Sequence, residues 1–337
     1  MVIKKTVAQR ASPLAFLKGK TVLVTGGTGT FGRAFVARLL MDQGVAKIIV
    51  LSRDELKQSE MQSHHAGESR LRFFLGDIRD VSRLKRAFEG VDIVVHAAAL
   101  KQVPATEYNP FEAIQTNIIG SKNVIDAALD CDVEKVLLIS SDKAVEPINL
   151  YGATKMCAEK LFVAANVYSG KKKKTAFSVV RYGNVIGSRG SLVELIERHR
   201  PSGKLTLTDE RMTRFWLRIE DVMDIVLECL SVMRGGETFV PKMKNMPVGD
   251  VIRMLAPECT IETTGMRPGE KLHETLITSY EAPRAHELRS VFAIAPEFGG
   301  DAGWLSKYPL MKKDSLYVSD NKKFLLTPEE AKKLFRR

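Results

Sequence analysis

The stretch "VTGGTGTFGRAF", residues 24–35, decides the fold of this chain. It connects a β-branched apolar run, residues 21–25, to a helical pattern over residues 31–42, and its glycines Gly26, Gly29 and Gly32 are spaced GxxGxxG. Glycines at a strand-to-helix turn let the backbone approach a pyrophosphate, which binds the free N–H groups of the helix N-terminus. The sequence therefore predicts a dinucleotide site at this turn.

Short apolar runs and helical patterns alternate from residue 20 to about residue 183. Further strands are predicted at 47–51, 71–75, 93–96, 136–139 and 177–181, and helices at 81–88, 111–130 and 151–167. Continuous apolar strands between helices are typical of a parallel sheet covered on both faces. We therefore predict an α/β protein with a doubly wound parallel sheet.

The pattern changes after residue 184, where Gly and Pro become frequent. We predict four parts. Residues 1–19 form an N-terminal extension that lacks the apolar core of a signal peptide. Residues 20–185 form the Rossmann domain. Residues 186–280 form a smaller α+β substrate-binding region, in which 236–242 is a candidate strand that returns to the main sheet, and the position of residues 281–337 is left open.

Composition limits the class of protein. The chain has 337 residues, 45% of them hydrophobic, which is enough for a sizeable core. Its net charge of +11 favours an anionic partner such as a nucleotide, a nucleic acid or a membrane surface, or else a solvated basic surface. No apolar run approaches the ~18 residues of a membrane span.

Cysteine and histidine spacing argues against a metal site. The four cysteines form no CxxC pair, and the six histidines show no HExxH spacing. Isolated thiols fit a reducing compartment, so we predict a cytoplasmic protein without a metal.

The tip of the second predicted strand bears on the choice of cofactor. An acidic residue there would bind the ribose 2′-hydroxyl of NAD, and a basic one the 2′-phosphate of NADP. The tip is Ser52-Arg53 with Lys57 one helical turn further on, which favours NADP, although Asp54 is a rival candidate two positions past the tip. Asp77 and Ile78, after the third strand, are expected at the adenine.

The fourth predicted strand ends in "HAAALK", residues 96–101. Its small alanines permit the close passage of a cofactor. We expect His96 to be a hydrogen-bonded core residue rather than a base.

"SSDKAVEPINLYGATK", residues 140–155, follows the fifth predicted strand. Tyr151 and Lys155 are four residues apart on one helix face, and Ser141 is at the position of a hydroxyl donor. Lowering the pKa of a phenol from about 10 to about 7 takes roughly 4 kcal/mol. One ammonium about 4 Å away supplies that order of energy at an effective dielectric near 20. Lys155, with the second positive charge of an oxidised nicotinamide, is therefore expected to make Tyr151 a base.

Asp142 and Lys143 are not needed for simple alcohol oxidation. At a strand tip they face the ligand, and an acid beside a base suits elimination of water. This chemistry requires a protonated Asp142 and a neutral Lys143, which direct pairing of the two would disfavour. Neighbours in an extended chain point to opposite sides, so we expect the two to be unpaired.

Together these motifs resemble the UDP-N-acetylglucosamine 4,6-dehydratases of the extended short-chain dehydrogenase/reductase class, most closely the configuration-inverting kind. The resemblance covers residues 20–280. Its motifs are "TGGTGTFG", "SRDELKQSEM", "HAAALKQVPATEYNPFEAIQTNIIGS", "SSDKAVEPINLYGATK", "FSVVRYGNVIGSRGS", "MTRFW" and "RPGEKLHE".

The resemblance implies a hydro-lyase of glycan biosynthesis. Tyr151 deprotonates the C4 hydroxyl while a hydride passes from C4 to NADP. Lys143 then removes the C5 proton, and Asp142 protonates the departing C6 hydroxyl. After hydride return to C6 and reprotonation of C5 from the opposite face, the product is UDP-2-acetamido-2,6-dideoxy-β-L-arabino-hex-4-ulose. Retaining dehydratases usually have a glutamate where Lys143 stands.

The resemblance and the turn together imply a set of ligand contacts. The expected cofactor contacts are Gly26, Thr28, Gly29, Thr30, Phe31, Gly32, Ser52, Arg53, Asp54, Glu55, Leu56, Lys57, Asp77, Ile78, Ala97, Lys101, Ser140, Ser141, Tyr151 and Lys155. The expected substrate contacts are Lys101, Asn184, Arg189, Thr206 and Arg267. Family members associate through helices like 111–130 and 151–167, so a homo-oligomer is expected.

Four alternatives remain open at this point. A retaining dehydratase would share every motif, and a UDP-sugar 4-epimerase needs only the Ser141, Tyr151 and Lys155 set. A non-catalytic NADP sensor would not need that set. A nucleic-acid binder is disfavoured because the chain has no aromatic-basic motif.

Overall fold

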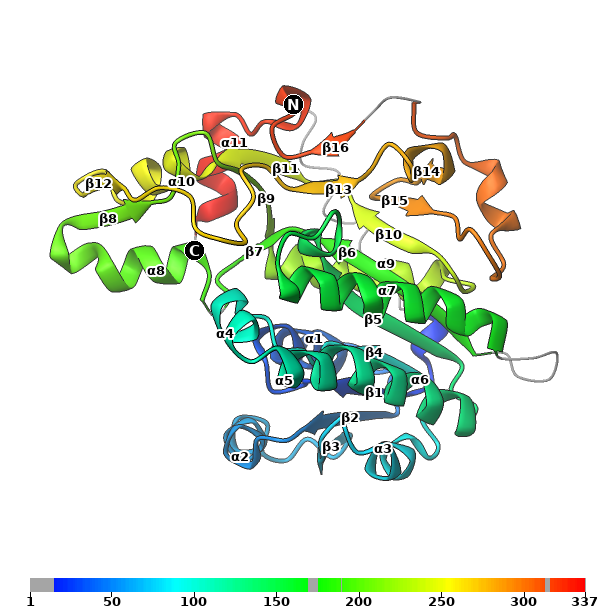
Figure 1. Ribbon diagram of the computed structural model, residues 1–337. Helices are drawn as coiled ribbons and strands as arrows, with labels where there is room; N and C mark the ends of the chain where they lie inside the picture. The colour runs from blue at the N-terminus through cyan, green and yellow to red at the C-terminus, as the bar shows by residue number, and fades with distance from the viewer. Residues whose placement is uncertain (1–14, 169–174, 189, 313–315, 337) are drawn as a thin grey trace, which may run out of the picture.

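The computed structural model describes residues 15–168, 175–188, 190–312 and 316–336. Its centre is a nine-stranded sheet of order β14-β15-β10-β6-β5-β4-β1-β2-β3 (Figure 1). The seven strands from β3 to β10 are parallel, β15 runs antiparallel to β10, and β14 runs antiparallel to β15. The bounds are β1 (Thr21–Thr25), β2 (Lys47–Ser52), β3 (Leu71–Leu75), β4 (Ile93–His96), β5 (Lys135–Ser141), β6 (Ala176–Tyr182), β10 (Thr238–Pro241), β14 (Ala285–Glu287) and β15 (Val291–Ile294).

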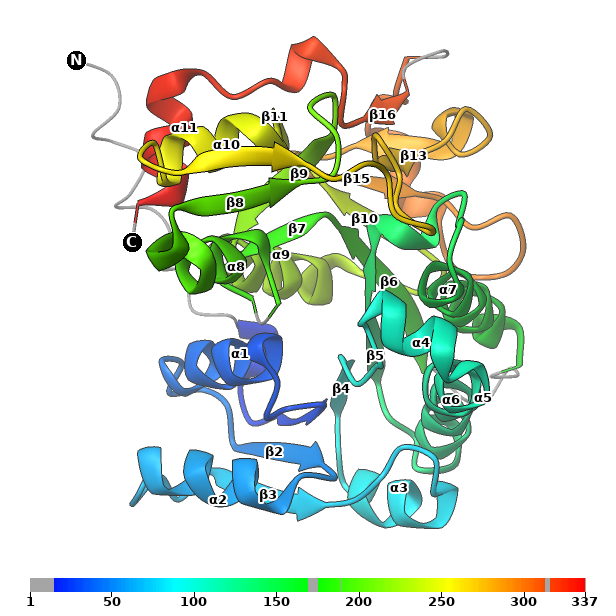
Figure 2. The same cartoon turned by 60° about the vertical axis from the view of Figure 1, so that its left-hand side comes forward.

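Helices cover both faces of this sheet, as Figure 2 shows. One face carries α1 (Thr30–Leu40), α2 (Glu55–His64) and α9 (Ile219–Val232), and the other carries α3 (Val81–Phe88), α6 (Gly120–Asp130) and α7 (Leu150–Tyr168). Each face has its own apolar core, around Phe35 and Val226 on the first and around Val124 and Phe162 on the second. The predicted doubly wound α/β fold is therefore confirmed.

The predicted elements agree with the observed ones to within two residues, with one exception. The helix predicted at 111–130 is interrupted: α5 (Pro110–Ile114) is followed by a π-helical turn, Gln115–Ile119, and then by α6. A short helix, α4 (Val103–Tyr108), precedes it. Within the π turn, Asn117 accepts a hydrogen bond from the Leu100 amide and donates one to its carbonyl. The turn thus fixes the loop that carries Lys101.

A second region lies beyond the carboxyl ends of the parallel strands (Figure 2). It contains a three-stranded sheet and a two-stranded pair flanked by helices, packed around Trp216. Its elements are β7 (Asn184–Ile186), α8 (Leu192–His199), β8 (Lys204–Leu207), β9 (Thr213–Arg218), β11 (Lys244–Pro247), α10 (Val248–Leu255) and β12 (Thr260–Thr263).

Late segments of the chain belong to both regions. The candidate returning strand, residues 236–242, contains β10, which pairs with β6. The C-terminal segment returns to the second region: β16 (Tyr317–Val318) pairs with β13 (Thr275–Ile277), and Phe335 of α11 (Pro328–Phe335) packs edge-on against Trp216. Within the described ranges, no helix has the length and apolarity needed to cross a bilayer.

Candidate active site

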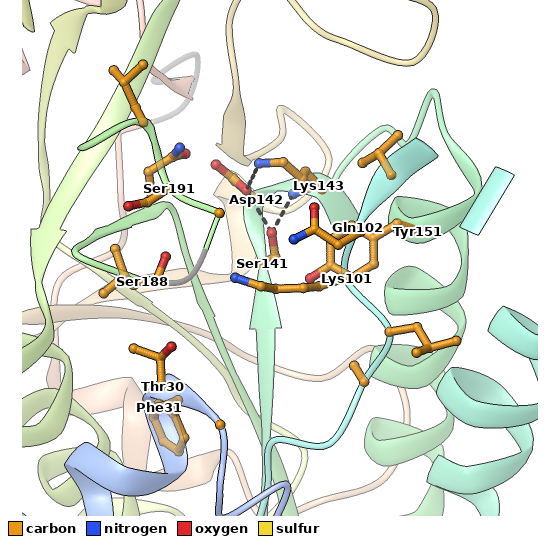
Figure 3. Close-up of a pocket in the computed structure, with 18 of the residues that line it drawn as sticks. Thr30, Phe31, Lys101, Gln102, Ser141, Asp142, Lys143, Tyr151, Ser188 and Ser191 are labelled. Atoms are coloured by element: carbon orange, nitrogen blue, oxygen red, sulfur yellow. Dashed lines mark hydrogen bonds and ion pairs between the residues drawn. The ribbon is translucent and has the colours of Figure 1, made fainter. Parts of the chain in front are cut away.

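A cavity of about 1100 Å³ lies between the sheet and the second region. Carboxyl ends of parallel strands form its floor, which is where doubly wound proteins bind ligands. We call the part around residues 26–32, 52–57, 76–78 and 97 the glycine-turn half. The part around residues 141–143, 214 and 267–274 is called the charged half. Figure 3 shows Ser141, Asp142 and Lys143 joined by polar contacts, with Thr30 and Phe31 of the glycine turn nearby.

The glycine turn is built from close backbone contacts. Gly26 has φ +65°, and a Cβ there would lie 2.9 Å from the Ala98 backbone. A Cβ on Gly32 would lie 2.4 Å from Gly27 Cα, whereas one on Gly29 would meet only the Gly26 carbonyl, at 3.2 Å. Gly26 and Gly32 therefore allow the turn to pack, and Gly29, which precedes the first residue of α1, leaves space for a ligand.

Buried polar atoms in the cavity also suit a dinucleotide. The hydroxyl oxygen of Ser140 and the amide oxygen of Asn184 are buried and have no hydrogen-bond partner among the residues that the structure describes. Buried polar atoms are normally hydrogen-bonded, so these two call for a polar ligand. The Ser140 hydroxyl, with the backbone N–H groups of the glycine turn, fits a bound nicotinamide dinucleotide. Asn184 begins β7 of the second region and suits a second ligand.

The tip of β2 holds charged groups that are already paired. Asp54 caps α2 by accepting a hydrogen bond from the Lys57 amide, and its carboxylate also contacts the Lys57 ammonium. The Arg53 guanidinium lies 3.7 Å from the Asp77 carboxylate, and its side chain is 55% exposed. Arg53 is therefore the basic side chain more open to a ligand phosphate.

His96 is a core residue, as predicted. It is 1% exposed, and its ring nitrogens hydrogen-bond to the hydroxyls of Thr25 and Ser121 at 2.7 and 3.1 Å. Burial, together with the charge of Lys155, lowers the pKa of His96 to about 3. The ring is therefore neutral at physiological pH and sits beneath the cavity floor.

Tyr151 and Lys155 are both buried in the cavity, and without the charge of a nicotinamide the pKa of Tyr151 is not lowered. Burial raises the pKa of Tyr151 above its ordinary value, although Lys143 and the hydroxyl of Ser141 act to lower it. The Lys155 ammonium donates instead to the Ile139 carbonyl at 2.7 Å, and burial lowers the pKa of Lys155 to about 8. One lysine thus does not outweigh the desolvation of the phenol.

Asp142 and Lys143 both face the cavity, but the prediction that they are unpaired is wrong. Residues Asp142–Ala144 form a 3-10 turn rather than an extended strand. The turn brings the two side chains together, with Lys143 Nζ 3.1 Å from Asp142 Oδ1. Asp142 is 1% exposed, and its Oδ1 also accepts a hydrogen bond from Ser141 at 2.8 Å.

The expected neutral Lys143 is also not found in this state. Burial acts to lower the pKa of Lys143, but the carboxylates of Asp142 and Glu274 raise it above its ordinary value. The resting site therefore holds an ion pair, not the acid and base that elimination needs.

Three charged residues of the charged half were missed by the sequence reasoning. Glu274 is 2% exposed, and its carboxylate lies 3.5 Å from Lys143, 3.7 Å from Arg214 and 3.9 Å from Lys271. Burial lowers the pKa of Lys271. All three lie in motifs that carried the resemblance, "MTRFW" and "RPGEKLHE". They can be identified only from the folded chain, which brings them together around Lys143.

Most predicted site residues line the cavity. Those that do are Gly26, Thr28, Gly29, Thr30, Phe31, Gly32, Ser52, Arg53, Asp54, Lys57, Asp77, Ile78, Ala97, Lys101, Ser140, Ser141, Asp142, Lys143, Tyr151, Lys155, Asn184, Thr206 and Arg267. Glu55 and Leu56 do not, because they lie in the first turn of α2, where Leu56 is 68% exposed. Arg189 lies outside the described residues.

The fold and the site define an extended short-chain dehydrogenase/reductase. The sequence matches the family described as "Polysaccharide biosynthesis protein" over residues 22–296. This chain therefore belongs to the polysaccharide biosynthesis family within that class.

Two curated relatives carry different activities in their names. "UDP-N-acetylglucosamine 4,6-dehydratase (inverting)" of Campylobacter jejuni is 49% identical over 280 residues, which are 82% of this chain and 83% of the relative. "UDP-glucose 4-epimerase" of Rickettsia bellii is 40% identical over 328 residues, or 94% of this chain and 95% of the relative.

Among solved structures, Pen from Bacillus thuringiensis superposes with a TM-score of 0.86 at 38% identity, covering 95% of this chain and 98% of that one. DesIV, a dTDP-glucose 4,6-dehydratase from Streptomyces venezuelae, has a TM-score of 0.67 at 24% identity, covering 75% of this chain and 86% of that one. The DesIV comparison bears on the fold alone.

Proposed function

We propose that this protein is a hydro-lyase that removes water from UDP-N-acetylglucosamine across C5 and C6 and inverts C5. The observation that carries the proposal is the Asp142–Lys143 pair, which faces the same cavity as Ser141, Tyr151 and Lys155. An oxidoreductase or epimerase needs the last three residues only, whereas elimination needs an acid and a base as well. The name of the Campylobacter jejuni relative supports the same reaction.

The proposed cofactor is NADP. Arg53 at the tip of β2 supports this choice, because a half-exposed guanidinium can form paired hydrogen bonds with a 2′-phosphate. When bound, the nicotinamide would supply the hydride chemistry, removal from C4 of the sugar and return to C6. The backbone of the glycine turn and the hydroxyl of Ser140 would hold the dinucleotide.

The first proton moves to Tyr151. In the complex, a cationic nicotinamide ring would lower the pKa of the buried phenol, which Lys155 alone does not do. Tyr151 Oη then takes the C4 hydroxyl proton as the C4 ketone forms. Ser141 can orient the hydroxyl, since it is hydrogen-bonded to Asp142 and lines the same cavity.

The ketone acidifies the C5 proton, and the ion pair supplies the groups for elimination. A single proton that passes from Lys143 Nζ to Asp142 Oδ1 along their 3.1 Å hydrogen bond creates a neutral base and a protonated acid together. Lys143 then takes the C5 proton, the C5–H electron pair forms the C5–C6 double bond, and the C6–O bond breaks. Asp142 gives its proton to the departing hydroxyl, which leaves as water, and the ion pair is restored. Once C6 has received the returned hydride, C5 takes a proton from solvent on the opposite face, and Tyr151 releases the C4 hydroxyl proton to solvent.

The UDP group would be held by the second region. Arg267 and Asn184 line the cavity there, and a guanidinium suits a diphosphate. Lys101, Thr206 and the undescribed Arg189 are further proposed substrate contacts.

Incubation with UDP-N-acetylglucosamine in deuterated water tests the proposal. We expect a product lighter than the substrate by one water, apart from the added deuterium, which NMR would locate at C5 of the L-arabino 4-keto sugar. Tyr151→Phe is the matched inactive control. An unchanged mass would support a 4-epimerase, the activity named for the Rickettsia bellii relative, and a D-xylo product would support a retaining dehydratase.

We also propose that the protein is a cytoplasmic homo-oligomer. Large apolar side chains on α4, α5 and α7 support association, since Tyr108 is 87% and Phe111 80% exposed. The four cysteines are unpaired, which supports a reducing compartment. Phe111→Glu should shift the species seen by light scattering toward the monomer.

A further inference from the structure

We infer that Glu274 is a positioning residue for Lys143, holding its ammonium in the cavity and setting the charge around it during elimination. The inference rests on the proposed dehydration and assigns a role to a residue that does not itself touch the reacting atoms.

Lys143 lies between carboxylates from two regions of the fold. Asp142 is its neighbour at the end of β5, whereas Glu274 comes from the second region, directly before β13. The respective N–O distances are 3.1 and 3.5 Å. Holding a long, flexible lysine side chain in one position costs side-chain entropy. A second ionic contact helps to offset that cost.

Glu274 is itself fixed firmly. Its backbone amide donates to Ser319 Oγ at 2.8 Å, and its carbonyl accepts from the Ser319 amide at 2.9 Å. Arg214, 3.7 Å from the Glu274 carboxylate, donates to the carbonyls of Thr213, Leu272 and Lys271. The backbone at Glu274 is therefore held in place, with Arg214 beside the carboxylate.

Glu274 shares one feature with Asp142, a buried carboxylate oxygen without a hydrogen-bond partner in the described residues. Glu274 Oε2 is buried and makes no hydrogen bond to any residue in the described ranges, and Lys271 approaches it only to 3.9 Å. Burial of an incompletely hydrogen-bonded carboxylate costs free energy. An action of this carboxylate on Lys143 would account for a buried charge that carries such a cost.

The charges around Lys143 form a balanced set. Asp142 and Glu274 contribute two negative charges, and Arg214 and Lys271 two positive ones. When Asp142 holds a proton, the set around Lys143 has one excess positive charge, which disfavours a proton on Lys143. The pair therefore shares one proton, and Glu274 determines how strongly Lys143 competes for it. Tyr151 also faces Lys143, and Glu146 faces Lys271.

The test is the pH profile of dehydration in Glu274→Gln, which keeps the shape of the side chain and removes the charge. The active pair holds one shared proton, so the rise of the rate with pH reports the loss of a second proton from the pair, and removal of a nearby negative charge lowers the pKa of that step. The ascending limb of the curve of dehydration rate against pH should therefore move to lower pH by about one unit. Glu274→Asp should leave the limb in place while it lowers the plateau rate.

Lys271→Gln is the opposite test and remains available should Glu274→Gln fail to fold. It removes a positive charge, so the limb should move to higher pH. Glu287→Gln, a half-exposed residue paired with Lys242 far from the cavity, is the matched control and should leave the profile unchanged. Thermal unfolding of each variant separates loss of fold from loss of rate.

The outcomes distinguish the two proposals. A parent protein that dehydrates, combined with an unmoved limb in Glu274→Gln, overturns the role of Glu274 and leaves the proposed function intact. Shifts of the same sign in Glu274→Gln and Lys271→Gln also overturn that role. A parent protein that releases no water overturns the proposed function together with this inference.

Discussion

The two halves of the cavity are formed by different kinds of groups. The glycine-turn half is shaped by backbone atoms, because Gly26 and Gly32 bring chain segments into contacts too close for a Cβ. The charged half is shaped by ionised side chains from separate segments of the chain, and Lys143 is surrounded by Asp142 and Glu274.

This difference has a functional meaning. A binding site formed by backbone atoms has a single protonation state, so it binds its ligand without rearrangement. A cluster of ionised groups has several proton distributions of similar energy, so it can change its chemistry when a ligand adds charge or excludes water. The first half suits a cofactor that stays bound, and the second half suits proton transfer.

Lys143→Ala is expected to have the largest effect on the charged half. Removal of a general base costs about 10²–10⁴-fold in rate, so loss of water should fall by that factor while slow C4 oxidation persists. Mass spectrometry measures the water loss, and absorbance of the reduced nicotinamide measures the oxidation. Lys160→Ala, an exposed lysine of α7, is the control. Dehydration at the parental rate would remove Lys143 from the mechanism.

In the glycine-turn half, Gly32→Ala and Gly29→Ala should separate packing from ligand approach. Gly32→Ala forces the backbone apart and should lower the free energy of unfolding by about 1–3 kcal/mol. Gly29→Ala should largely retain stability but lose dinucleotide affinity. Thermal unfolding and ligand titration measure the two effects. Full affinity in Gly29→Ala would contradict the proposed approach of the pyrophosphate.

Arg53→Ala tests whether a side chain of the glycine-turn half contributes to dinucleotide affinity. Loss of a charge-assisted hydrogen bond of about 1.5 kcal/mol should weaken NADP binding roughly tenfold and leave NAD binding unchanged. Arg86→Ala, 74% exposed on α3, is the control. Equal loss for both dinucleotides would contradict the NADP proposal.

The prediction for His96 concerns stability alone, not binding or catalysis. Its pKa of about 3 lies below the ordinary 6.5, so the unfolded chain takes up a proton between these values while the folded chain does not. The free energy of unfolding should therefore fall with decreasing pH in this window, by up to about 1.4 kcal/mol per unit.

His96→Gln should show a shallower dependence on pH in urea unfolding, whereas the exposed His64→Gln should behave like the parent. Equal slopes for His96→Gln and the parent would contradict this account.

The difference between the two halves of the cavity also explains what could be predicted from the sequence. The strands and the glycine turn follow from local patterns, so their positions were predicted within one or two residues. The 3-10 turn at Asp142–Ala144 has no such pattern, and reading it as extended led to the wrong prediction about Lys143. Glu274 and Arg214 meet Lys143 only through the tertiary fold, which spacing in one sequence does not reveal.

The hydrogen bonds between Ser319 and the backbone of Glu274 have a consequence for biosynthesis. Domains generally fold from the N-terminus during translation. The segments that form the glycine-turn half leave the ribosome first, whereas Ser319 emerges much later. A nascent chain therefore completes the glycine-turn half well before the support behind Glu274 exists.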